Sequence, residues 1–380
     1  MTRELSKLIG VAGGPIDLLD GCSPVTRRLL HVVHELLDEP HHAVDAKRVL
    51  ALYCTRDLGL DLDDVERACE DIGAHVQRVY PPGTVGDAYR TLLRLAQPWQ
   101  TRYPLIDASG MIGDHHDDDP GGPDLLSLRV SRVSRAVLPL DRAPLLPIGL
   151  LNGQVESDAI VPPHNLSELW TAMEHIRQTP DESLDDLLEV LPGPDFPTGG
   201  VIWGVEPIRQ LYETGSAVLV VRASIEDELQ GSRTRVAISS VPPGVLVHTV
   251  LSQIRDLARR GRLPLMQVED LSTETRVRLL IDAPRTLSTA ELKAVLFDET
   301  ACQRILPCRL AFHEAGGAVA RPLRDWLAEA NRRCTPAWRP KDGPILERVP
   351  TLREILERGG YESPLFDVGD QRRTKILTGA

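Results

Sequence analysis

Apolar residues recur at helical spacing through the first third of the chain. Behind Pro24, the run VTRRLLHVVHELL carries apolar residues three and four positions apart, which predicts an amphipathic helix. The same spacing predicts helices over 61–78 and 85–99. The stretch RYPLIDASGMIGDHHDDDPGGPD (102–124) is rich in turn-forming residues and is predicted to be a loop. Periodicity leaves LLSLRVSRVSRAVL (125–138) open between helix and strand.

The pattern changes near residue 150, where short runs rich in β-branched residues alternate with helical stretches. Strands are predicted at 217–225, 235–241 and 276–282, and helices at 163–177, 181–190, 245–260 and 288–297. Strands interspersed with helices in this way are typical of an α+β fold. We therefore predict an α+β protein whose first part is mostly helical.

Turn-rich joins suggest the domain boundaries. The Pro-rich run TPAWRPKDGP at 335–344 leads to a short predicted helix near 351–358 and a polar tail. Together with the change of pattern, this divides the chain into a first domain (1–145), a second domain (146–335) and a short C-terminal segment (336–380).

Charge and cysteine content narrow the function. The 380 residues carry 43 Lys and Arg against 55 Asp and Glu, a net charge of −12, which disfavours a general binder of nucleic acid or membrane surfaces. The six cysteines form no CxxC pair and suit a reducing compartment. Because no apolar run reaches about 18 residues and the N-terminus is a poor signal peptide, we expect a cytoplasmic protein without membrane contact.

The most conspicuous polar cluster is Asp114-His115-His116-Asp117-Asp118-Asp119. Its imidazoles and carboxylates are ligands for a divalent metal, but one loop rarely supplies a whole coordination shell, so we interpret it as a solvated acidic loop. The chain has no GxxxxGK[ST], GxGxxG, GxSxG or HExxH motif. We therefore predict neither a cofactor nor a metal.

Other segments carry a more specific signal. The relevant blocks are LDGCSPVTRRLL (19–30), RVYPPGTVGDAYRTLLRLAQ (78–97), RYPLIDASGMIG (102–113), PPHNLSELWTAMEHI (162–176), LPGPDFPTGGVIWG (191–204), IRQLYETGSAVLVVRA (208–223) and FDVGDQRRTKIL (366–377). In order and spacing they resemble the A subunit of the bacterial type IIA DNA topoisomerases, gyrase and topoisomerase IV. The resemblance covers about 15–335 and 366–377.

This resemblance implies a winged-helix DNA-gate domain followed by a tower-like α+β domain. In the family, a long coiled coil and an exit gate separate the tower from the segment that resembles FDVGDQRRTKIL; here, residues 336–365 take their place. The resemblance also implies a homodimer, which we expect to form through the DNA-gate domain.

The family cuts DNA through a tyrosine hydroxyl that attacks a phosphodiester, helped by a neighbouring arginine and by metal on a partner chain. By resemblance, its Arg-Tyr pair falls on Asp124 and Leu125, or on Leu125 and Leu126 in a second alignment. Leucine has no nucleophilic atom, and an aspartate repels phosphate. We therefore predict that the chain is not an enzyme and has no catalytic residue.

Other DNA-facing positions of the family are also altered. They correspond here to Ser23, Thr26, Pro81, Gly83, Gly86, Arg90, Leu246 and Val247. The retained positive charges, which we take as DNA-binding candidates, are Arg27, Arg28, Arg94, Arg102, Arg129 and Arg132. Some of these arginines are alternatively interpreted as partners of nearby acids.

Three functions follow from the resemblance. The favoured hypothesis is a catalytically inactive, regulatory A-subunit homologue that binds DNA, weakly, or binds a type IIA topoisomerase subunit. The second is a true topoisomerase component that uses an unusual tyrosine, such as Tyr80 or Tyr89, or a heteromeric partner. The third is an acidic decoy or self-protection protein that binds gyrase or its inhibitors instead of DNA.

Overall fold

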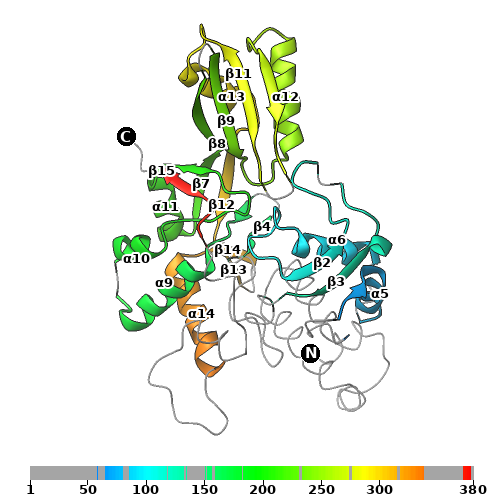
Figure 1. Ribbon diagram of the computed structural model, residues 1–380. Coiled ribbons are helices and arrows are strands. Elements are labelled where there is room, and N and C mark those ends of the chain that lie inside the picture. Colours follow the sequence, from blue (N-terminus) through cyan, green and yellow to red (C-terminus); the bar gives the residue numbers. More distant parts are fainter. Residues whose placement is uncertain are drawn as a thin grey trace.

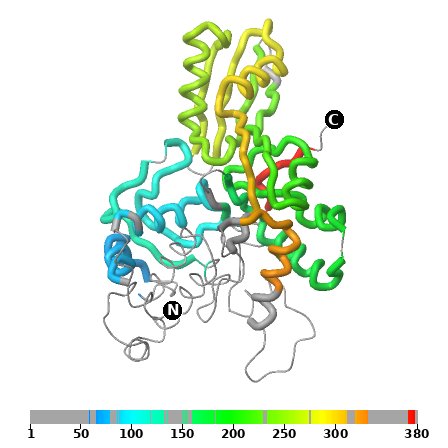
Figure 2. The backbone as a smooth tube through the Cα atoms, turned by 180° about the vertical axis from the view of Figure 1, so that it is seen from behind, coloured from blue at the N-terminus to red at the C-terminus, as the bar shows by residue number. Residues whose placement is uncertain are grey.

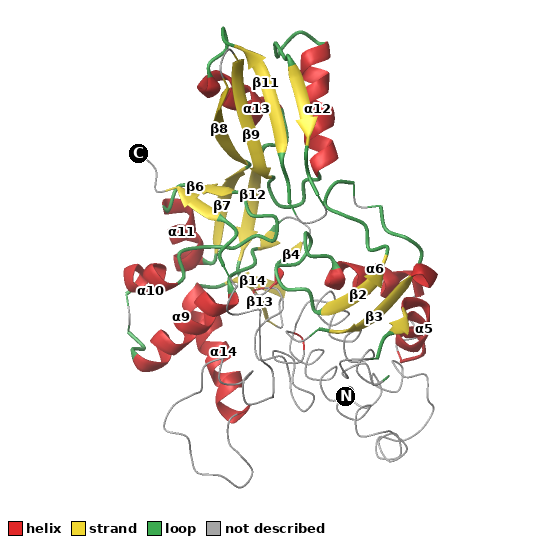
Figure 3. Cartoon of the chain, viewed as in Figure 1, coloured by secondary structure: helices red, strands yellow, loops and turns green. Residues whose placement is uncertain are grey.

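The computed structural model describes residues 58, 65–79, 85–117, 119–131, 134, 150, 152–155, 159–181, 183–230, 233–273, 276–314, 317–337 and 371–377. These residues form three parts, a small N-terminal part, a central part and an upper part that projects from the centre (Figure 1). The mixture of helices and sheets agrees with the predicted α+β class (Figure 3). The winged-helix and tower assignments themselves stay predictions.

The N-terminal part has two helices packed against a small antiparallel sheet of order β1-β3-β2. Its elements are β1 (Arg67–Ala68), α5 (Cys69–Val79), α6 (Val85–Ala96), β2 (Ile106–Gly110), a 3₁₀ turn (Pro123–Leu125) and β3 (Leu126–Val130). β2 lies inside the stretch predicted to be a loop, and this prediction was wrong. Pairing with β3 along the whole strand, from Ile106 opposite Val130 to Gly110 opposite Leu126, overrides the turn-forming residues.

A six-stranded sheet of order β15-β6-β7-β12-β5-β4 forms the centre of the molecule. Its strands are β4 (Gln154–Val155), β5 (Ile160–Val161), β6 (Val201–Trp203), β7 (Ser216–Arg222), β12 (Gln303–Arg309) and β15 (Lys375–Leu377). Four helices accompany it, α9 (Leu166–Gln178), α10 (Leu184–Val190), α11 (Glu206–Thr214) and α14 (Leu323–Ala337), beside a hairpin of β13 (Ala311–Glu314) and β14 (Gly317–Ala320). One hydrophobic core continues from this part into the N-terminal part.

The upper part contains a four-stranded antiparallel sheet of order β10-β11-β9-β8 and two helices. The elements are β8 (Ser224–Gln230), β9 (Arg233–Ser240), α12 (Val247–Arg259), β10 (Gln267–Asp270), β11 (Leu279–Pro284) and α13 (Thr289–Glu299). Their apolar faces enclose a second, separate core. From behind, α12 again lies on the same side of the molecule as the N-terminal part (Figure 2).

Local capping explains where several of the helices begin or end. The side chain of Asn165 accepts a hydrogen bond from the Glu168 N–H at the start of α9, and Ser288 forms a capping box with Glu291 at the start of α13. Gly215 ends α11 at φ 77°, and a Cβ there would lie 2.3 Å from the Arg321 carbonyl oxygen. Only glycine therefore fits this position of the YETG sequence.

The chain returns to the central sheet after the long interval that follows α14. β15 pairs in parallel with β6, so that Lys375 lies opposite Val201 and Leu377 opposite Trp203. The segment FDVGDQRRTKIL thus ends as an edge strand beside LPGPDFPTGGVIWG. None of the helices among the described residues has the length and apolar character needed to cross a bilayer.

Candidate functional site

The loop that joins β2 to β3 corresponds to the position where the resemblance puts the family's nucleophile. The loop closes on itself because the Gly121 N–H donates to the Met111 carbonyl oxygen over 2.8 Å, and Tyr89 donates its hydroxyl proton to the Gly121 carbonyl. Gly110 has φ 114°, and a Cβ there would lie only 2.1 Å from the Leu125 carbonyl oxygen. The path of the loop therefore depends on a glycine at residue 110.

The three residues at the aligned nucleophile positions differ in exposure. Asp124 is exposed within the 3₁₀ turn, Leu125 is 53% exposed, and Leu126 is buried at the start of β3. Of the two alignments, only the one that puts Leu125 at the tyrosine position presents that side chain to solvent. Met111 is exposed as well, so an apolar surface occupies this turn in place of a group that can attack phosphate.

The described tyrosines and Cys69 are not poised as nucleophiles. Burial, together with the nearby Cys69, raises the pKa of Tyr89, so its hydroxyl stays protonated. Tyr103 accepts the Leu166 N–H at 2.7 Å, and Tyr212 is fully buried. Burial also raises the pKa of the Cys69 thiol to about 12, so it is not poised as a nucleophile. Tyr53, Tyr80 and Tyr361 lie outside the described residues.

The predicted DNA-binding arginines that the structure describes differ in exposure. Arg102 is 1% exposed, and its Nε lies 2.7 Å from Asp195 Oδ2, so the prediction that it faces DNA is corrected. Its charge balances a buried carboxylate, as the alternative interpretation held. Arg94 is exposed on α6, and Arg129 on β3 is half-exposed with its Nε 3.3 Å from Asp107. The remaining candidates, Arg27, Arg28 and Arg132, lie outside the described residues.

The acidic cluster at 114–119 joins the N-terminal part to the upper part. The carbonyl oxygens of His115 and His116 accept the N–H groups of Val247 and His248 at the first turn of α12, at 3.2 and 3.0 Å. His116 Nε2 also lies 2.8 Å from Asp270 Oδ2. The interpretation as a solvated loop was therefore incomplete, because both histidines make contacts across the junction. Among the residues that can be described, no group of three His, Cys, Asp or Glu could hold a metal.

The structure also explains one altered position. Val247, where the resemblance expects the lysine of an Asn-Lys pair, is 1% exposed beneath that loop. An apolar side chain suits this contact, whereas an ammonium group would be desolvated there. This position has thus become part of the junction instead of a surface for phosphate.

One basic surface was missed in the sequence. Four arginines within eight residues, Arg255, Arg259, Arg260 and Arg262, are exposed at the outer end of α12 and just after it. Arg259 pairs with Asp256 and Arg262 with Glu299, both at the surface. The run IRDLARRGR could have signalled this surface, but the negative net charge of the whole chain conceals it.

The comparisons with known proteins all point to the same family of relatives. Residues 142–330 match the family of the A subunit of DNA gyrase and topoisomerase IV. The DNA gyrase A subunit of Kosmotoga olearia is 29% identical over 329 residues, which is 80% of this chain and 37% of the relative. That of Thermotoga maritima is 27% identical over 313 residues (76% and 36%), and that of Granulibacter bethesdensis 28% over 338 residues (82% and 34%). The chain thus spans about a third of the length of these relatives.

These similarities overturn the prediction that the chain is not an enzyme. The relatives that cover most of the chain are DNA gyrase A subunits by name, which places it among topoisomerase-like proteins, and loss of activity is not shown. The physical reason is that Leu125 rules out a nucleophile at one aligned position only and does not exclude one elsewhere in the chain.

Proposed function

The chain is a divergent member of the gyrase and topoisomerase IV A-subunit family, and on that premise we propose that it binds duplex DNA within a type IIA topoisomerase assembly. The observation that carries the proposal is the exposed series Arg255, Arg259, Arg260 and Arg262 on the upper part. This series belongs to the helix that lies on the same side as the N-terminal part (Figures 1 and 2).

Phosphate neutralisation is the physical basis of this binding. A guanidinium group at the surface releases condensed counterions when it contacts a DNA phosphate, and this gain is independent of base sequence. Arg94 on α6 is exposed and adds a positive charge on the N-terminal part. Because the chain as a whole is acidic, binding is expected to be modest and steeply weakened by salt.

The aligned loop between β2 and β3 offers no nucleophile for strand cleavage in such an assembly. Leu125 occupies the exposed turn where the resemblance expects the tyrosine, and Tyr89 is hydrogen-bonded to the loop backbone. We therefore propose a heteromeric assembly in which a complete gyrase-type chain supplies the tyrosine, and this chain holds duplex DNA beside it. Self-association through the N-terminal part stays a prediction that light scattering tests.

The first test measures affinity for a fluorescent DNA duplex by anisotropy at several salt concentrations. Replacing all four arginines of the α12 series by alanine is expected to reduce the slope of log K against log salt by about 2 to 4, since each lost phosphate contact removes about 0.9. A control replaces Arg177 and Arg209, two ion-paired arginines on α9 and α11, and the loss of slope is compared per arginine removed. If the chain does not bind the duplex at low salt, or if the variant binds like the control, the proposal fails.

The second test measures DNA cleavage in the presence of this chain. The chain is mixed with both complete gyrase subunits, ATP, magnesium and supercoiled DNA, and covalent protein–DNA adducts are trapped with denaturant. We expect adducts on the tyrosine-bearing gyrase chain, and more of them, or at altered positions, when this chain is present. Adduct yield and position that are unaffected by this chain would contradict the heteromeric assembly while leaving DNA binding to the first test.

A further inference from the structure

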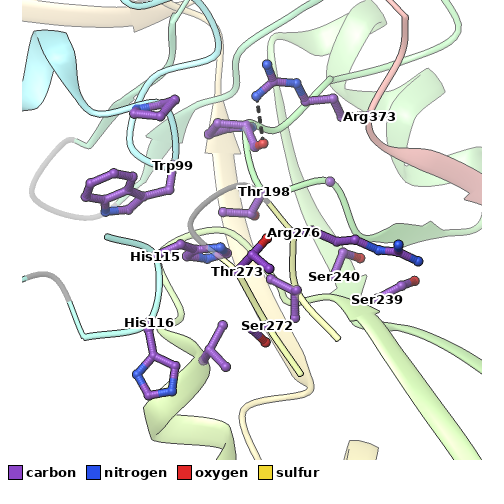
Figure 4. Close-up of a pocket in the computed structure, with 15 residues that line it drawn as sticks. Trp99, His115, His116, Thr198, Ser239, Ser240, Ser272, Thr273, Arg276 and Arg373 are labelled. Atoms are coloured by element: carbon purple, nitrogen blue, oxygen red, sulfur yellow. Dashed lines mark hydrogen bonds between the residues drawn. The ribbon is translucent and has the colours of Figure 1, made fainter. Parts of the chain in front are cut away.

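A cavity of about 520 Å³ opens where the three parts of the molecule meet. Trp99 and His115 line it from the N-terminal part, Thr198 from the central part, Ser240 and Arg276 from the upper part, and Arg373 from the C-terminal strand segment. In Figure 4, Trp99 and His115 lie on one side, and Arg276 and Ser240 lie on the other, with Thr198 between them. Segments from all three parts of the molecule, together with the C-terminal strand segment, thus build one site.

Two polar groups in this wall are buried without a hydrogen-bond partner. Trp99 is 9% exposed, and neither its indole N–H nor the Thr198 hydroxyl has a partner among the described residues. Native proteins rarely leave such groups unsatisfied, because desolvating them without a replacement bond is costly. An unpartnered N–H and hydroxyl beside a cavity therefore indicate a ligand that accepts hydrogen bonds.

The charged side chains that line the cavity are arginines. Arg276 and Arg373 line it, and no Asp or Glu is among the described lining residues. Two acids that contact lining residues or their neighbours already have partners. Asp195 accepts from Arg102 and from two backbone N–H groups, and Asp270 lies against His116.

The Ser240 hydroxyl adds a further hydrogen-bond donor to the cavity. Ser240 Oγ accepts the N–H groups of Gly200 and Ser224 at 3.1 and 3.2 Å, and its own proton has no acceptor among the described residues. Arg373 donates to the Pro197 carbonyl oxygen at 3.0 Å, which fixes its side chain at the rim. A molecule that carries a phosphate and further acceptor atoms can satisfy donors on both sides of the cavity.

The size of the cavity and its apolar wall indicate the size and character of the rest of the ligand. Its volume falls within the range of about 300 to 1,000 Å³ that is typical of small-molecule sites. Pro98, Pro197, Val247 and Val277 contribute apolar surface beside Trp99. We propose that the cavity binds a small phosphate-bearing molecule of nucleotide size, with its phosphate held by Arg276 and the Thr198 hydroxyl and its organic part against Trp99.

The position of the cavity gives the ligand a mechanical consequence. Its walls come in part from the N-terminal and upper parts, which also contact each other where the 115–116 loop meets α12. A bound molecule would bridge the N-terminal and upper parts and restrict movement between them. The inference does not rest on the proposed DNA binding, because it is measured without DNA.

The test uses isothermal titration calorimetry on the full chain with adenosine 5′-monophosphate as the probe, and with inorganic phosphate and adenosine as its two halves. We expect the nucleotide to bind at one site, phosphate to bind at least tenfold more weakly, and adenosine to give no heat. Arg276→Ala and Thr198→Val are each expected to weaken nucleotide binding about tenfold or more, and Arg209→Ala, far away on α11, to leave it unchanged. Arg276 and Arg209 each lose one positive charge, so net charge cannot explain a difference.

A titration with duplex DNA distinguishes binding of a free phosphate compound from binding of a phosphate in the DNA backbone. A blunt 12-base-pair duplex is titrated against the nucleotide complex; if the duplex displaces the nucleotide and loses its own binding in Thr198→Val, the cavity takes DNA backbone and the small-molecule proposal is overturned. It is also overturned if no heat appears at millimolar nucleotide, or if both variants bind like the parent. Thr198→Val is nearly isosteric, and circular dichroism confirms its fold, so a folding defect cannot be mistaken for lost binding.

Discussion

Arg102 and Asp195 form a buried ion pair that ties the N-terminal part to the central sheet. Arg102 Nε lies 2.7 Å from Asp195 Oδ2, and the two side chains are 1% and 0% exposed. The other carboxylate oxygen of Asp195 accepts the N–H groups of Arg373 and Thr374 at 2.8 and 2.9 Å. One carboxylate thus joins three segments that are far apart in the sequence.

Breaking this pair from one side should be strongly destabilising. Arg102→Met leaves a buried carboxylate without its counter-charge, and we expect the free energy of unfolding to fall by about 3 to 5 kcal/mol in urea denaturation. The control is Arg129→Met, which removes the surface pair with Asp107 and should cost at most about 1 kcal/mol. Equal losses in the two variants would show that the buried pair has no special role.

Thr374 holds the returning C-terminal strand segment. Its hydroxyl accepts the Phe196 N–H at 2.7 Å and donates to the Gly199 carbonyl at 3.3 Å, and the residue is fully buried. Thr374→Val keeps the shape but leaves both backbone groups unsatisfied, so unfolding should become easier by about 1 to 3 kcal/mol.

A matched substitution separates the hydroxyl from the β-branched shape. Thr171→Val removes an exposed hydroxyl that bonds the Ser167 carbonyl within α9, and should change stability by less than about 0.5 kcal/mol. Thermal or urea unfolding of both variants checks the comparison. If Thr374→Val were as stable as Thr171→Val, the segment 371–377 would be attached by its strand pairing with β6 alone.

Elements with a strong local signal could be predicted from the sequence. The helix predicted at 163–177 is observed at Leu166–Gln178, since its apolar spacing and its Asn165 cap are both local. The strand Ile106–Gly110 was missed because its stability comes from pairing with β3, which the turn-forming residues conceal. The helix predicted at 61–78 is observed from Cys69, because residues 67–68 pair with β3 instead.

The candidate site was predicted less well, for a related reason. Arg102 resembles a surface cation in the sequence, and its partner Asp195 lies 93 positions away. Likewise, the contact between the 115–116 loop and α12 joins residues about 130 positions apart. Local patterns carry no information on such pairs, whereas the family resemblance rests on long blocks and was confirmed by the comparisons.

Gly110 should be the least replaceable glycine of the loop between β2 and β3. In Gly110→Ala, the new Cβ would lie 2.1 Å from the Leu125 carbonyl oxygen at φ 114°, so the turn that carries Leu125 must move. We expect a loss of about 2 to 4 kcal/mol in unfolding free energy. Gly261→Ala is the control, since its φ is 69° but nothing lies within 4 Å, and it should cost about 1 to 2 kcal/mol. A smaller loss at residue 110 than at residue 261 would contradict this description of the loop.

His164 should make the protein less stable in mild acid. It is completely buried, and neither ring nitrogen has a hydrogen-bond partner among the described residues. Burial, and then the charge of Arg372, lowers its pKa to about 3. In the unfolded chain the ordinary pKa is about 6.5, so between pH 6.5 and 3 the unfolded state binds a proton that the folded state refuses.

Stability is therefore lost as the pH falls below about 6.5, and the loss stops growing below about pH 3. Between pH 7.5 and 5.5 this one residue should lower the free energy of unfolding by about 1.4 kcal/mol. Urea denaturation of the parent and of His164→Phe at both pH values isolates the contribution, because phenylalanine fills the site beside Tyr212 but does not titrate. The difference in stability between the two pH values should be smaller by about 1.4 kcal/mol in the variant. An unchanged difference would mean that His164 is protonated in the folded state, contrary to its burial.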